Sequence, residues 1–138
     1  MGQQQILVLV LGIALVGLAV YTGAEVFMRS KRQQHADLLV SHAVYVASEA
    51  TTWRSKSPFL GGGDSYVNLE TNGMRKLALA DTRPPGIVRI TFASRDSLEV
   101  TAVSDYYDDI GVRVHVSGAT IVKTSVSYNG NITFPASD

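Results

Sequence analysis

The three histidines are the side chains in this sequence best suited to acid–base or metal chemistry. His35 and His42 are seven residues apart in a segment with helical spacing, so they return to a similar helix face. His115 lies on the polar side of an alternating segment. This is not the spacing of a metal-binding motif. We therefore assign the three histidines surface or packing roles and predict no metal site.

The densest acidic run is the segment 105–109, which reads DYYDD. Carboxylates are the hard oxygen ligands that Ca²⁺ prefers, but their spacing here is not that of an EF-hand loop. We interpret this run as a solvated hairpin loop.

A glycine triplet, Gly61–Gly63, stands near Ser65 and resembles a phosphate cradle only superficially. The spacing GxxxxGK[ST] is missing, and no helix with a lysine follows, so we interpret the triplet as a linking loop. The sequence has no Ser–His–Asp pattern and no cysteine. We expect no catalytic site and no cofactor, and disulfides, thiolate zinc sites and covalently attached haem are excluded.

Composition limits the function classes further. The 138 residues suit one modest domain with an appendage. Twelve basic residues balance twelve acidic ones, which argues against nucleic acid as the primary partner, because binding to phosphates needs a basic excess. Only 17% of the residues are charged, and the first charge is Glu25.

The uncharged residues 1–24 contain the wholly aliphatic and glycine run Ile6–Val20. As a helix, 24 residues measure about 36 Å, enough to cross a bilayer core of about 30 Å. We assign 1–24 to a transmembrane or filament-core helix.

Three interpretations of this helix compete. A signal peptide should have a basic start and a small-residue cleavage site, which this segment lacks. A simple signal anchor conflicts with Arg29, Lys31 and Arg32, because the positive-inside rule would place the following domain in the cytoplasm. The third interpretation is a processed chain whose basic leader has been removed.

The segment 25–56 is predicted to continue the helix in amphipathic form. Its apolar stripe has spacings of four, three, four and three residues and consists of Leu39, Ala43, Val46, Ala50 and Trp53. The first proline is Pro58, so the whole helix can reach about 75–80 Å. Gly12, Gly17 and Gly23 permit close approach of neighbouring helices, or are ordinary transmembrane residues.

After the connecting loop region 57–86, with a short helical turn expected around Met74–Leu79, the period becomes two. Alternation predicts four strands in the head domain 87–138, at about 88–92, 98–102, 112–116 and 122–128. We expect an α+β fold, in which the apolar stripe of the helix covers the apolar face of a four-stranded antiparallel sheet.

Two motifs carry a resemblance to a known family. Gly2-Gln3-Gln4-Gln5 runs directly into ILVLVLG, and a glycine-rich loop, Leu60–Tyr66, follows the long helix. In these features and in its architecture, the chain resembles type IV pilins, nearest to the bacterial pilin-like proteins with a GQQQ start.

The resemblance implies a precursor in the inner membrane, cut by a prepilin peptidase either before Met1 or after Gly2. We prefer the first site, because a two-residue uncharged leader could not orient the helix, and Met1 is then the processed N-terminus. The mature chain would join identical copies in a helical filament on the cell surface. We assign the assembly core to Gln3, Gln4, Gln5, Ile6, Leu9, Gly12, Leu15, Gly17 and Gly23.

The chain also departs from the pilin pattern. Gln5 stands where pilins usually carry a glutamate, and Thr22 and Gly23 stand where many carry a proline. A neutral amide costs less to bury than a carboxylate and still forms hydrogen bonds between helices. The alternative functions are a minor pilin or pseudopilin of a secretion or uptake machine, and a monomeric membrane-anchored binding domain.

Overall fold

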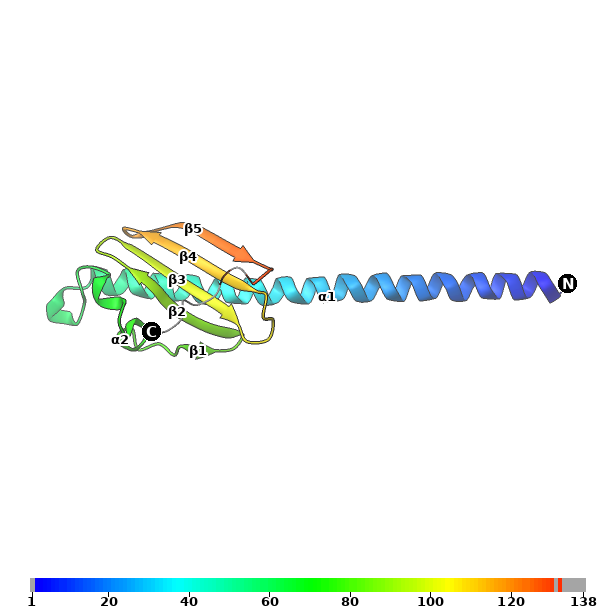
Figure 1. Ribbon diagram of the computed structural model, residues 1–138, viewed down its shortest axis with the longest axis horizontal. Coiled ribbons are helices and arrows are strands. Elements are labelled where there is room, and N and C mark those ends of the chain that lie inside the picture. The colour runs from blue at the N-terminus through cyan, green and yellow to red at the C-terminus, as the bar shows by residue number, and fades with distance from the viewer. Residues whose placement is uncertain (1, 131, 133–138) are drawn as a thin grey trace. The chain divides into compact units, whose positions relative to one another are not determined.

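The computed structural model describes residues 2–130 and 132 and has the expected α+β class. The long helix α1 (Gly2–Ser55) is followed by the short helices η1 (Pro58–Leu60), η2 (Val67–Leu69) and α2 (Gly73–Lys76). Within the described residues five strands follow: β1 (Thr82–Arg83), β2 (Gly86–Ala93), β3 (Ser97–Ser104), β4 (Gly111–Ser117) and β5 (Thr120–Ser127) (Figure 1). The chain divides into two compact units, residues 1–34 and 35–138.

All five strands of the second unit form one antiparallel sheet in chain order, β1-β2-β3-β4-β5. The prediction of four strands was one too few. The additional strand β1 has only two residues, which pair with Ile87 and Gly86 of β2. A strand of two residues is too short to show an alternating pattern, so the sequence could not reveal β1.

The core of the second unit lies between α1 and one face of the sheet. Four residues of the predicted stripe, Leu39, Ala43, Val46 and Ala50, are buried there, and Trp53 is partly buried against them. The sheet contributes buried residues from three neighbouring strands, including Val88, Val100, Ala102, Val112 and Val114. The predicted packing of the helix on the sheet is therefore confirmed within this unit.

Strand β5 differs from the interior strands because its apolar side chains are exposed. Val122 is 66% exposed and Val126 is 39% exposed, whereas Val112 and Val114 on the neighbouring strand are fully buried. β5 is at the edge of the sheet, and its register with β4 shifts between His115 and Val116. Alternation showed that this segment was a strand, but it could not show that the strand lies at an edge.

The glycine triplet is part of a tightly packed loop. Gly61 has a positive φ of 78° and closes η1, where its N–H donates to the carbonyl of Pro58. A Cβ added at Gly62 would overlap the backbone carbonyl of Lys56, and one added at Gly63 would overlap the ring of Trp53. These glycines thus allow the backbone to pass close to the end of α1.

We predict that Gly63→Ala lowers the free energy of unfolding by about 1–3 kcal/mol, because the new methyl group forces Trp53 or the loop to move. The measurement is thermal unfolding of the full chain in detergent, followed by near-ultraviolet circular dichroism of Trp53. Gly12→Ala is the control, since nothing lies within 4 Å of its added Cβ. Equal stability of both variants would contradict the close packing at Gly63.

Candidate functional site

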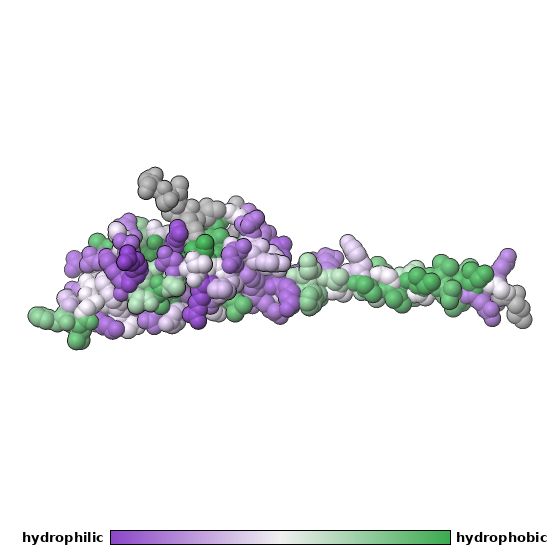
Figure 2. Space-filling view, turned by 90° about the horizontal axis from the view of Figure 1, so that it is seen from below, coloured by the Kyte–Doolittle hydropathy of each residue, from purple (hydrophilic) through white to green (hydrophobic). Residues whose placement is uncertain are grey.

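The segment Ile6–Val20 of α1 has a continuous apolar surface that is exposed in the described chain. Its large aliphatic side chains are each 56–69% exposed, and they point in every direction around the helix. The green surface of α1 in Figure 2 corresponds to this segment. A continuous apolar surface of this extent marks a membrane or protein interaction site. Among the described residues, α1 is the one helix long and apolar enough to cross a membrane, judged by length and composition.

Polar groups near the apolar segment are few and uncharged. Gln3, Gln4 and Gln5 are exposed at the start of α1. The hydroxyl of Thr22 lies within hydrogen-bond distance of the carbonyl oxygens of Leu18 and Ala19, at 3.0 and 3.1 Å. Bonding back to the helix in this way reduces the cost of placing a hydroxyl in apolar surroundings.

The helix glycines leave room beside the backbone. Nothing lies within 4 Å of a Cβ added at Gly12, Gly17 or Gly23. A shallow groove on one side of the helix is lined by Leu9, Gly12, Ile13, Val16 and Gly17. Such a groove can accept the side chains or backbone of a second helix.

The structure brings His35 together with the loop between β3 and β4, which contains the acidic run. His35 Nε2 lies 2.6 Å from Ser104 Oγ, and the His35 and Tyr107 rings meet edge to face at 5.1 Å. Ser104 Oγ also accepts the backbone N–H groups of Tyr106 and Tyr107, at 3.1 and 2.8 Å. We infer that its own proton is donated to His35 Nε2.

His115 belongs to a polar cluster on the other face of the sheet. Glu99 is paired with His115 Nε2 at 3.1 Å and with Arg113 Nε at 3.2 Å, and Thr91 donates to the same carboxylate at 3.0 Å. Sequence reasoning did not find this cluster. Its signal was the charged and hydroxyl residues on the polar side of three strands, but only the register shows which of them meet.

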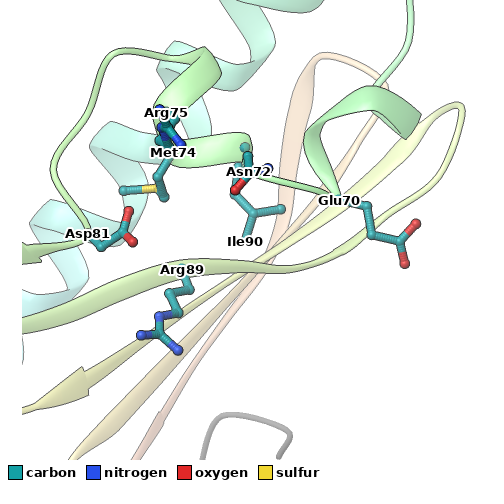
Figure 3. Close-up of a pocket in the computed structure, with 8 residues that line it drawn as sticks. Glu70, Asn72, Met74, Arg75, Asp81, Arg89 and Ile90 are labelled. Atoms are coloured by element: carbon teal, nitrogen blue, oxygen red, sulfur yellow. The ribbon is translucent and has the colours of Figure 1, made fainter. Parts of the chain in front are cut away.

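His42 lies apart from the other two histidines, beside Tyr45 and Val46 in a hollow that Leu79 and Val88 also line. Within residues 2–130 and 132, no three acidic or histidine side chains gather in a way that could hold a metal ion. A polar hollow near α2 includes Glu70, Asp81 and Arg89. Figure 3 shows Glu70 and Arg89 pointing away from each other, so these two charges do not converge on one position.

The predicted processed residue, Met1, lies outside the described residues. Comparisons with protein-family models, with curated proteins and with solved structures found no match to this chain. The candidate functional site is therefore defined by the residues alone, and it is the apolar segment with its glutamines and glycines.

We predict that Ser104→Ala lowers the free energy of unfolding by about 1–3 kcal/mol, because the part-buried N–H groups of Tyr106 and Tyr107 and the ring of His35 lose their partner. Amide hydrogen exchange at Tyr106 and Tyr107 should become faster in the same variant. Ser41→Ala is the control, since Ser41 is exposed and bonds only back to its own helix at Asp37. Unchanged exchange at both tyrosines would show that Ser104 does not order this loop.

Proposed function

We propose that this chain is a structural subunit of an extracellular helical filament, and that it is held in a membrane before assembly. The observation that carries the proposal is the exposed, uncharged surface of α1 over residues 2–24. The proposal includes the type IV pilin-like character, with removal of a leader by a prepilin peptidase.

The apolar segment is large enough that we expect lipid or protein, rather than water, to surround it at every stage. It has eleven large aliphatic side chains. Burying each contributes about 1.5–3 kcal/mol, so burying all of them contributes at most roughly 30 kcal/mol. Exposing this surface to water would cost this free energy. Either lipid or other copies of the same helix can cover it.

The glutamines and glycines favour other copies as the final surroundings. Side-chain amides both donate and accept hydrogen bonds, so Gln3, Gln4 and Gln5 can pair with the same residues of an identical helix. Gly12 and Gly17 leave space for close approach between helices. In this proposal, neutral amides replace the usual ion pair of pilin assembly.

A second candidate function, a minor pilin or a monomeric membrane-anchored binding domain, uses the same helix only as an anchor. Electron microscopy of filaments sheared from cells separates the two. Long filaments made mainly of this chain support the major subunit. A chain found only as a membrane-bound monomer supports the anchored form.

We predict that Leu9→Asp or Leu15→Asp abolishes filaments, because an unpaired carboxylate would have to be buried among apolar helices. The measurement is filament abundance in sheared fractions, together with the head's unfolding transition in detergent, which should stay unchanged. Leu9→Met keeps the site apolar and should assemble normally. Normal filament abundance in both aspartate variants would contradict the proposed helical core.

We also predict that Gly12→Val with Gly17→Val reduces filament number while the chain still enters the membrane. The added side chains fill the shallow groove on α1, where a second helix would pack, without changing its apolar character. Ala14→Val adds apolar volume outside the residues that line the groove and serves as the control. An equal loss of filaments in the control would argue against a specific role of the glycines.

A further inference from the structure

The short helix η1 presents two large apolar side chains at the surface of the second unit. Phe59 is 101% exposed and Leu60 is 77% exposed. In Figure 1, η1 is the green coil beyond the end of α1. We refer to these two residues as the apolar knob. A fully exposed side chain adds nothing to the packing of its own unit, so the fold does not explain the knob.

The backbone that carries the knob is held in one conformation. Ser57 Oγ accepts the N–H of Phe59 at 3.3 Å. The carbonyl of Ser57 accepts the N–H groups of Leu60 and Gly62, at 2.8 and 3.1 Å. Because this loop is already ordered, binding through the knob costs little additional conformational entropy.

The second unit also has an apolar hollow. It has a volume of about 300 Å³ and lies between α1, the chain after α2, and β2. Its lining includes the apolar residues Val46, Leu79, Ala80 and Val88, with His42 and Arg83 among the polar ones. A cavity of about 150 Å³ holds a benzene molecule, so this hollow has room for the ring of a phenylalanine and a second apolar side chain.

The knob of one molecule does not fill the hollow of the same molecule. Phe59 is fully exposed, and His42 and Val46 lie roughly 14–20 Å before the end of α1 at Ser55. A contact between a knob and a hollow at different places on one chain therefore joins different copies. Such a contact is heterologous, and it repeats from copy to copy into an open helical array when it does not close into a ring.

The size of this contact indicates which partner can make it. The two side chains of the knob bury on the order of 300–400 Å², and the hollow a similar area. Stable complexes between free proteins bury about 1,200–2,000 Å² in total. The knob is therefore too small to hold a protein from solution, and it acts between chains that a second interface already holds together. Copies joined through their apolar segments meet this condition.

We propose that the apolar knob of one copy inserts into the apolar hollow of a neighbouring copy in the filament. This inference rests on the proposed function, because the apolar segments have to hold the two copies side by side. With parallel helices, the receiving copy is displaced by roughly 15 Å or more along the helix axis. The hollow near α2, with Glu70, Asp81 and Arg89, is polar and does not suit the same side chains.

The first test uses Leu60→Cys with Ala80→Cys in the full chain, which has no native cysteine. Leu60 lies beside Phe59 in the knob, and Ala80 is exposed at the hollow. Sheared filaments are treated with a bismaleimide that has a flexible spacer, and the products are separated by denaturing electrophoresis. Because each copy takes part in two such contacts, we expect a ladder of dimers, trimers and longer chains. The matched control, Leu60→Cys with Lys123→Cys on the exposed strand β5, should give no ladder.

The second test removes the ring of the knob with Phe59→Ser. The unfolding transition of the chain in detergent should stay unchanged, because this side chain is fully exposed. Sheared filaments should dissociate roughly tenfold faster or more on warming, since each contact loses a buried phenylalanine. Val122→Ser, at a side chain 66% exposed on β5, is the control and should leave the dissociation rate unchanged.

Two results would overturn this inference alone. One is that the ladder is missing from intact filaments or equally strong in the Lys123→Cys control. The other is that Phe59→Ser filaments dissociate at the rate of the unmodified chain. If the unmodified chain itself forms no filaments, both this inference and the proposed function fail.

Discussion

One constraint governs the rest of this molecule: in the described part of the chain, nearly half of the long helix has an exposed apolar surface. Residues 2–24 contain no charge, and their side chains are exposed. Further along the same helix, the apolar residues narrow to a stripe that the sheet covers. A single continuous helix therefore has to satisfy two environments. The order of those environments along the chain separates the exposed apolar segment from the part of α1 that packs on the sheet.

The packing of the second unit, residues 35–138, depends on how closely α1 approaches the sheet. Small residues of α1, including Ala43, Ala47 and Ala50, are completely buried and keep the helix close to the strands. Leu39 fills the space near Gly86, where an added Cβ would come within 3.0 Å of its side chain. At the far end of α1, Arg54 is paired with Asp96 at 2.5 Å and lies over the ring of Tyr66. The Tyr66 hydroxyl donates to the carbonyl of Gly118 at 2.6 Å, which fastens the loop after α1 to the turn between β4 and β5.

The features that the sequence predicted well are those with a strong period. The stripe at Leu39, Ala43, Val46 and Ala50 repeats over about three turns, and the alternation in 112–116 extends over most of strand β4. No periodic pattern in the sequence reveals β1 or the exposure of β5. Strand pairing and edge position depend on residues that are distant in sequence. The His35–Ser104 contact joins residues 69 positions apart, so no local pattern could reveal it. Aliphatic composition alone was enough to locate the apolar segment, whose large side chains are exposed.

The central claim is that copies of the apolar segment cover one another. Because the chain has no native cysteine, one cysteine introduced at Val16 forms intermolecular disulfides only where two such helices meet. The direct measurement is mild oxidation of cells followed by non-reducing electrophoresis of the sheared extracellular fraction. The account predicts cross-linked dimers in that fraction from Val16→Cys, and far fewer from Ser55→Cys at the exposed end of α1. Val16→Cys that stays monomeric in the sheared fraction, or a chain that never leaves the membrane, would contradict it.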